Sequence, residues 1–130
     1  MKVEDILKMK DIAVVGISRN PDKPSHYVPR YMLENGYNVI PVNPFTDRLF
    51  EKKCYKSLSD VEGNVEIVNI FRPSEEVPEI VRDAILKKVK VIWMQERIEN
   101  EAAAEEAKKH DIEVVMNTCI MKEHKALYKV

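Results

Sequence analysis

The feature that most constrains this chain is a repeated alternation of short apolar runs with segments of helical character. The first run, "DIAVVGI" at residues 11–17, is continuously apolar, which is typical of a strand covered on both faces. Further runs follow at residues 37–44, 65–71, 89–94 and 112–117. Such alternation favours a parallel sheet, and right-handed crossovers place helices on both faces. We therefore predict a Rossmann-like, doubly wound α/β fold with a mainly parallel five-stranded sheet.

Local signals set the expected limits of the helices. Pro29 belongs in a first turn, so the first long helix is expected to start near Tyr27 or Val28 and to stop at Gly36. Ser74 is expected to cap the next helix, whose apolar residues recur at helical spacing. Its predicted buried face consists of Val77, Ile80, Val81, Ala84 and Ile85.

The remaining helical segments are shorter. Asn100 can cap a helix over residues 100–110. A short helix over residues 57–61 would complete the crossover in the stretch 45–64. Amphipathic pieces lie near both ends, at residues 3–9 and 121–127.

Length and composition exclude several classes of protein. With 130 residues, the chain is expected to form one domain over residues 1–130. Its net charge of -1 argues against a nucleic-acid partner, which normally requires a basic excess. No apolar run reaches the roughly 18 residues of a membrane span, and the N-terminus lacks a secretory core. Cys54 and Cys119 lie far apart and suggest no disulfide framework, so we expect a cytoplasmic protein.

Ligands of doubly wound folds bind outside the carboxyl ends of the strands, where the strand order reverses. That rule selects Gly16–Lys23, Val42–Pro44, Phe71–Pro73, Met94–Arg97 and Asn117–Cys119. The first stretch leads from a strand into a helix N-terminus, where free N–H groups and the helix dipole favour a phosphate. Ser18 adds a hydroxyl there, and Arg19 and Lys23 add positive charge. An ordinary turn, in which Gly16 serves packing and the basic residues serve solubility, remains an alternative.

The nucleotide-binding fingerprints are incomplete. NAD sites need G-x-G-x-x-G/A and an acidic residue about 20 positions later. This turn has the sequence G-I-S-R-N-P, and the second strand ends in Asn43 and Pro44 with no acid. No G-K-[ST] loop occurs either. NAD is therefore disfavoured.

The chain resembles the small single-domain CoA-binding proteins, and it is similar to the N-terminal domain of the succinyl-CoA synthetase alpha subunit. The resemblance runs in order through "VVGISRNPDKPSHYVPRYMLENGYNVIPVNP", "CYKSLSDV", "NIFRPSEEVPEIV", "VIWMQ" and "VVMNTCIMKEHKAL". Its most specific parts are G-x-S-x-x-P-x-K-x-S, "PVNP" and "FRP". Where family members usually have a glycine after W-x-Q, this chain has Glu96 and Arg97.

The resemblance implies that CoA lies across the carboxyl ends of the strands. The expected contacts are Gly16, Ile17, Ser18, Arg19, Lys23, Val42, Asn43, Pro44, Phe71, Arg72, Pro73, Met94 and Gln95. We expect Arg19, Lys23 and Arg72 to share the phosphates. Apolar walls for the pantetheine arm are expected from Pro44, Phe71, Pro73 and Met94.

No catalytic constellation is visible in the sequence. None of His26, His110 and His124 stands next to a nucleophile and an acid, and Cys119 with His124 supplies too few ligands for zinc. The first hypothesis is therefore a stand-alone module that binds CoA or an acyl-CoA without catalysis. Its rivals are a degenerate or accessory subunit of an acyl-CoA synthetase-type ligase, another nucleotide enzyme, or a CoA-sensing module with an unidentified protein partner.

Overall fold

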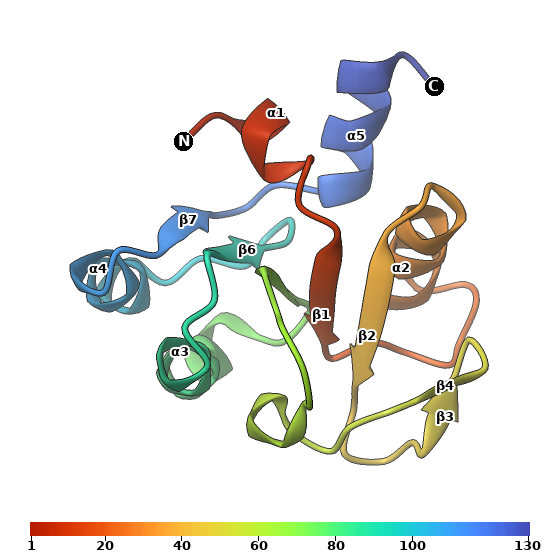
Figure 1. Ribbon diagram of the computed structural model, residues 1–130, viewed down its shortest axis with the longest axis horizontal. Coiled ribbons are helices and arrows are strands. Elements are labelled where there is room, and N and C mark those ends of the chain that lie inside the picture. The colour runs from red at the N-terminus through yellow and green to blue at the C-terminus, as the bar shows by residue number, and fades with distance from the viewer.

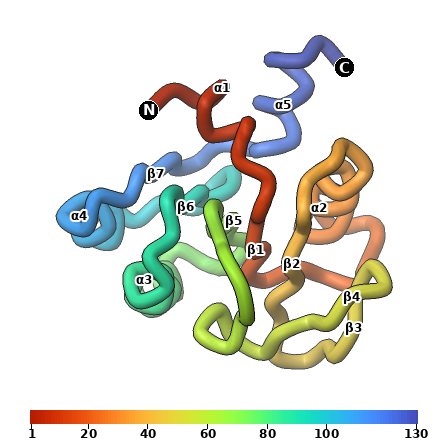
Figure 2. The backbone as a smooth tube through the Cα atoms, in the orientation of Figure 1, coloured from red at the N-terminus to blue at the C-terminus, as the bar shows by residue number.

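The computed structural model describes residues 1–130 and contains a parallel sheet of five strands (Figure 1). The strands are β1 (Asp11–Val15), β2 (Asn38–Val42), β5 (Ile67–Ile70), β6 (Val91–Met94) and β7 (Glu113–Val115). Their order is β2-β1-β5-β6-β7, with every neighbouring pair parallel, and Figure 2 shows β5 between β1 and β6. The predicted Rossmann-like, doubly wound fold is confirmed. Because the chain passes from β1 to β2 on one side and continues with β5 on the other, the strand order reverses between β1 and β5.

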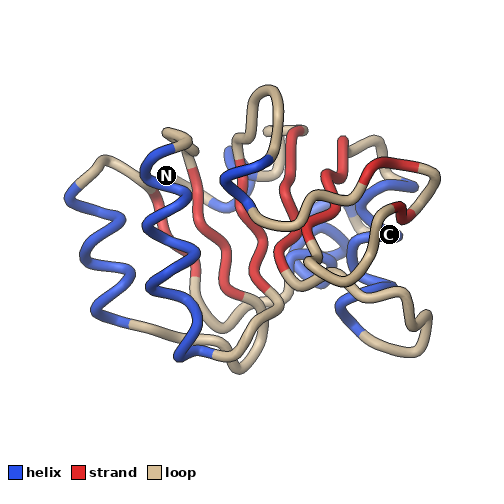
Figure 3. Tube along the Cα trace, turned by 90° about the horizontal axis from the view of Figure 1, so that it is seen from below, coloured by secondary structure: helices blue, strands red, loops and turns tan.

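Helices cover both faces of the sheet, as predicted. One face carries α1 (Val3–Ile6), α2 (Pro24–Glu34) and α5 (Ile120–Tyr128). The other carries the 3-10 helix η1 (Leu58–Asp60), α3 (Val77–Leu86) and α4 (Glu101–Lys109). Seen from below in Figure 3, α3 and α4 lie in front of the strands. None of these helices is long and apolar enough to cross a membrane.

Each face has its own hydrophobic core. On β6, Ile92 and Met94 join the core under α3 and α4, whereas Val91 and Trp93 join the core under α2 and α5. All four side chains are fully buried. Burial of an aliphatic side chain of this size contributes about 1.5–3 kcal/mol. Strands with both faces covered are apolar throughout, which is why the sequence shows continuous runs rather than alternation.

The start of α2 differs from the prediction. The helix begins at Pro24, which takes the first helical position, and Pro29 lies in its interior. Pro29 has no N–H with which to bond the carbonyl of Ser25. That carbonyl instead accepts a hydrogen bond from the N–H of Ser18, 3.0 Å away. A tertiary contact thus replaces the missing helical bond, and the predicted start near residues 27–28 was wrong.

The structure differs from the prediction at two further places. Ser74 does not cap α3 but opens the 3-10 helix η2 (Ser74–Glu76), and its hydroxyl accepts from the N–H of Glu99. Within the crossover, a hairpin of β3 (Arg48–Leu49) and β4 (Lys52–Lys53) was not predicted. Its turn residues, Phe50 and Glu51, both have positive φ, a conformation that Asn-Gly sequences usually signal. The caps at Asn100 and Gly36 are confirmed.

Candidate functional site

Three adjoining hollows form a groove along the carboxyl ends of the strands. The central hollow, about 470 Å³, is bordered by Gly16, Ser18, Arg19, Lys23 and Arg72. Toward α3 it shares Gly16, Asn43, Phe45 and Arg72 with a hollow of about 460 Å³, here named the α3-side hollow. Toward α5 it shares Lys23, Ser25 and Phe71 with a hollow of about 640 Å³, the α5-side hollow. The edge predicted from the strand order is therefore a continuous concave surface.

Gly16 is required by the close approach of the third strand end. Its φ is +91°, and a Cβ there would lie 2.7 Å from the Phe71 carbonyl oxygen and 2.7 Å from Cδ of Arg72. No larger residue fits without displacing backbone. The packing role that was left open for Gly16 is therefore present, and the contact brings Arg72 to the turn.

Hydrogen bonds hold the turn after Gly16 in one conformation. The Ser18 N–H donates to the Ser25 carbonyl inside α2, and the Ser18 hydroxyl oxygen accepts from the N–H of Asn20 at 3.0 Å. The buried His26 donates from Nδ1 to the Ser18 carbonyl at 2.6 Å. A turn fixed in this way loses little conformational freedom when a ligand binds. His26 thus has a structural role.

Donors and positive charge converge on the central hollow. The backbone N–H groups of Ile17, Arg19 and Ser25 donate to no backbone carbonyl. Ser25 is in the first turn of α2, at the positive end of the helix dipole. The side chains of Arg19 and Lys23 are exposed and form none of the ion pairs within the chain. This arrangement suits an anion such as phosphate.

Arg72 borders the same hollow, but it already has a partner. Its Nε and Nη2 donate to the two carboxylate oxygens of Glu76, at 3.1 and 2.8 Å. The hydrogen bond from Arg72 lowers the pKa of the Glu76 carboxyl. The three predicted cations therefore lie around one hollow, with Arg19 and Lys23 free and Arg72 held in an ion pair.

The end of β2 supplies a link and an exposed ring. Asn43 donates from Nδ2 to the Ile17 carbonyl at 2.7 Å and accepts from the N–H of Phe45 at 2.8 Å, so its side chain joins two loops. Val42 and Ile17 are buried, whereas Pro44 is exposed. Phe45 is 88% exposed and borders both the central and the α3-side hollow. Sequence reasoning missed Phe45, although its place directly after "PVNP" was a signal.

The predicted apolar walls are only partly present. Phe71 is half-buried and borders the central and α5-side hollows. Met94 is fully buried in the core under α3 and α4, so its side chain forms no wall of the groove. Pro73 is exposed and borders none of the three hollows. The side chain of Gln95 accepts from the N–H of Ile120 and fixes the start of α5 beside the α5-side hollow.

The loop after β6 contains Glu96 and Arg97, where the resemblance led us to expect a glycine. Arg97 has a φ of +69°, and its N–H donates to Oδ1 of Asn117 at 2.6 Å. Glu96 pairs with Lys122 of α5 at 2.9 Å. A glycine would adopt this backbone without strain. Here a side-chain hydrogen bond stabilises the same conformation.

His124 lies outside the groove. Its Nδ1 lies 2.7 Å from the Tyr31 hydroxyl, and its ring packs against those of Tyr31, Tyr37 and Tyr128. It borders none of the three hollows. Cys119 is buried at the N-cap of α5, beside the α5-side hollow. No group of three or more side chains is arranged to hold a metal ion.

The chain is similar to several known proteins. A family model described as a CoA binding domain matches residues 10–125. "Uncharacterized protein YneT" of Bacillus subtilis is 38% identical over 124 residues, which cover 95% of this chain and 92% of that protein. A hypothetical protein from Pyrococcus horikoshii OT3 has a structure with a TM-score of 0.93 and 37% identity, covering 98% of this chain and 93% of its own.

Larger enzymes contain a similar unit. Acetate–CoA ligase (ADP-forming) II of Archaeoglobus fulgidus is 33% identical over 90 residues. The match covers 68% of this chain but 13% of the ligase. Together with the family model over residues 10–125, these relatives establish that the chain belongs to the CoA-binding-domain family.

Proposed function

We propose that this protein binds coenzyme A, free or acylated, without transforming it. The observation that carries the proposal is the central hollow, where Arg19, Lys23 and unpaired backbone N–H groups meet at the N-terminus of α2. CoA has a pyrophosphate and a 3′-phosphate, and a helix N-terminus flanked by cations favours such groups. Membership of the CoA-binding-domain family supports the same ligand.

In this proposal the expected contact residues have three different roles. Gly16, Ile17 and Ser18 act through the backbone and hydroxyl of the turn, while Arg19, Lys23 and Arg72 supply charge. Val42, Asn43, Pro44, Phe71 and Gln95 border the groove. Pro73 and Met94, which the resemblance also implied, border none of its hollows and are not proposed as side-chain contacts. The α5-side hollow has apolar side chains, among them Tyr27, Phe71 and Met121, that suit the pantetheine arm. Both cysteines are free and buried, in keeping with the cytoplasmic setting that we propose.

A second candidate is an accessory unit of an acyl-CoA ligase or a CoA-sensing module. The similarity to 13% of an acetate–CoA ligase favours it, because the chain corresponds to one part of a larger enzyme. Affinity capture from a lysate with and without CoA separates the candidates. Capture of a ligase subunit, with ligase turnover on recombination, supports the accessory unit. CoA binding by the purified chain without such a partner supports the stand-alone binder.

The role of the three cations can be tested one at a time. We expect Arg19→Ala and Lys23→Ala to weaken CoA binding about tenfold each at low salt, because a hydrogen bond to a charged group contributes about 1.5–3 kcal/mol and exposure reduces this value. A smaller loss is expected for Arg72→Ala, since Glu76 already occupies that guanidinium. Titration calorimetry at two salt concentrations measures these effects, and Arg30→Ala, exposed on α2 and outside the groove, is the matched control.

Binding of dephospho-CoA, which lacks the 3′-phosphate, shows which phosphate of CoA each cation contacts. A residue that binds the 3′-phosphate should lose its effect with this ligand, whereas one that binds the pyrophosphate should keep it. If all three variants bind CoA as tightly as Arg30→Ala does, the basic residues serve solubility and the proposed phosphate site is wrong.

A further inference from the structure

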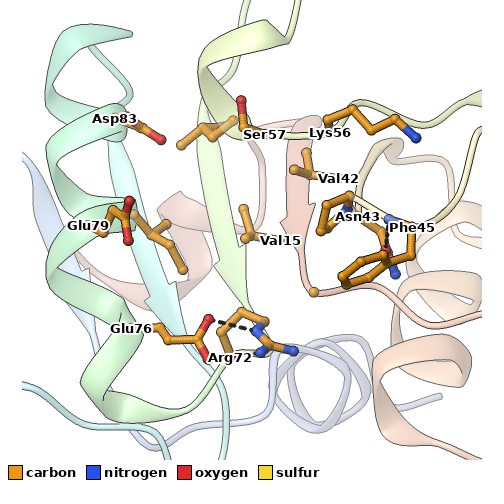
Figure 4. A pocket seen from close by; sticks show the side chains of 14 residues that line it. Val15, Val42, Asn43, Phe45, Lys56, Ser57, Arg72, Glu76, Glu79 and Asp83 are labelled. Atoms are coloured by element: carbon orange, nitrogen blue, oxygen red, sulfur yellow. Dashed lines mark hydrogen bonds and ion pairs between the residues drawn. The ribbon is translucent and has the colours of Figure 1, made fainter.

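The residues that line the α3-side hollow suit a planar, partly apolar group. Val15, Val42 and Ile80 contribute apolar surface to it. The exposed ring of Phe45 stands at its rim, and Figure 4 shows Glu79 and Asp83 of α3 on the opposite wall. An aromatic ring at the edge of an apolar hollow offers a stacking surface to a planar ligand.

Glu79 and Asp83, which form the acidic wall of this hollow, take part in none of the ion pairs within the chain. Asp83 is half-buried, and its carboxylate accepts no side-chain hydrogen bond that would lower its pKa. Burial and the nearby Glu79 raise the pKa of Asp83, and their effect outweighs the opposite effect of Arg82. Lys56, the lysine in the same hollow, pairs with Asp47 at 2.9 Å. The wall therefore presents hydrogen-bond acceptors without partners.

The two ends of this part of the groove have opposite charge. The central hollow carries Arg19 and Lys23, whereas the α3-side hollow carries Glu79 and Asp83. Phosphates are repelled by the acidic wall and attracted to the central hollow. A ligand that spans both must therefore place an uncharged part with hydrogen-bond donors against α3. Of the parts of CoA, adenine is planar, stacks on aromatic rings and carries two N–H donors on its exocyclic amine.

We infer that Asp83, assisted by Glu79, accepts hydrogen bonds from the exocyclic amine of a purine base in the α3-side hollow, with Phe45 stacked on the base. This inference rests on the proposed function and adds to it the residues that select the base. An ionised carboxylate can only accept hydrogen bonds, so it favours a base with an amine over one without.

The test compares CoA with 1,N6-etheno-CoA, in which the exocyclic amine is tied into a ring and donates no hydrogen bond. The readout is the ratio of the two dissociation constants, because the phosphates are common to both ligands and their contribution cancels. We expect the parent protein to prefer CoA by about tenfold, the loss associated with one charge-assisted hydrogen bond. Asp83→Leu should reduce this preference to less than about twofold, because it removes the acceptor.

Two more variants separate recognition from structure. Asp83→Asn keeps an acceptor oxygen and should retain part of the preference. Glu75→Gln, an exposed acid just before α3 that borders none of the hollows, should leave the ratio at the parent value. Phe45→Ala should weaken both ligands equally, since either base can stack.

The outcomes distinguish this inference from the proposed function. If the parent binds both ligands equally, or Asp83→Leu keeps the full preference, the inference is overturned while CoA binding stands. If the folded parent binds neither ligand, the proposed function itself fails.

Discussion

At the scale of single residues, Gly16 and Gly63 have nearly the same positive φ angle in very different surroundings. Their φ angles are +91° and +87°. A Cβ on Gly16 would lie 2.7 Å from backbone and side-chain atoms, whereas a Cβ on Gly63 would meet nothing within 4 Å. Alanine substitutions at these two positions therefore separate the energetic cost of backbone strain from the cost of steric overlap.

We predict that Gly63→Ala lowers the free energy of unfolding by about 1–2 kcal/mol, the usual penalty for a left-handed residue with a side chain. Gly16→Ala should lower it by about 1–3 kcal/mol more, because the neighbouring strand end must move. Urea denaturation measures both. Equal losses would contradict the close approach of Phe71 and Arg72. Because Gly16→Ala displaces Arg72, weaker CoA binding by that variant would not demonstrate a direct contact.

Asn69 is a polar residue in an apolar layer. It lies on β5 between Val14 and Trp93, is fully buried, and neither polar atom of its side chain has a hydrogen-bond partner. An unsatisfied buried polar group costs about 1–3 kcal/mol. Leucine has a similar shape without that cost.

We predict that Asn69→Leu raises the free energy of unfolding by about 1–3 kcal/mol. Chemical denaturation provides the measurement, and Asn64→Leu at an exposed position is the control. A loss of stability in Asn69→Leu, with Asn64→Leu unchanged, would show that the amide has a partner in solution.

At the scale of elements, His124 is one of the contacts that attach α5 to the rest of the molecule. The ring is buried among three tyrosines from α2, the start of β2 and α5 itself. Burial, with a contribution from Lys10, lowers the pKa of His124. Protonation therefore favours the unfolded state, in which the imidazole has its ordinary pKa of about 6.5.

We therefore predict that acid weakens the packing of α5 against the rest of the molecule. The stability that neutral His124 contributes is complete above about pH 6.5 and is lost as the pH falls through the lower folded-state pKa. His124→Phe should flatten that part of the pH profile of the melting temperature. The same acid slope in His124→Phe and the parent would assign it to other groups.

The sequence predicts elements well where local signals decide and poorly where tertiary contacts do. Five apolar runs identified the five strands of the sheet, and Asn100 and Gly36 marked helix ends correctly. The start of α2 was misplaced because the contact that makes Pro29 tolerable comes from Ser18, outside the helix. The β3–β4 hairpin lacks the Asn or Gly that such turns usually carry.

In the candidate site, too, the sequence predicted some features and missed those that depend on tertiary structure. Its cations were placed correctly around one hollow, because the carboxyl ends of parallel strands share an edge. The burial of Met94 was not predictable, since a strand with two apolar faces gives no alternation to show where each side chain points. The acidic wall was not predicted, because the apolar pattern of α3 shows which residues face the core but not which polar residues border a hollow.

At the scale of the whole molecule, a net charge of -1 conceals a polarised groove. Cations surround the central hollow and carboxylates line the neighbouring one. We expect such a pattern to orient an elongated ligand that has both phosphates and a neutral base, and to select against ligands that are anionic along their whole length. Orientation by local charge is consistent with a near-neutral surface elsewhere.

The central claim is that this groove binds CoA, and titration calorimetry of the purified protein with CoA and with NAD tests it most directly. We predict one CoA site per chain and NAD binding at least about tenfold weaker, because the turn lacks the second and third glycines and the end of β2 lacks the acid of NAD sites. A rise in melting temperature with CoA concentration should accompany binding. No binding of millimolar CoA by folded protein, or NAD bound as tightly as CoA, would contradict the account.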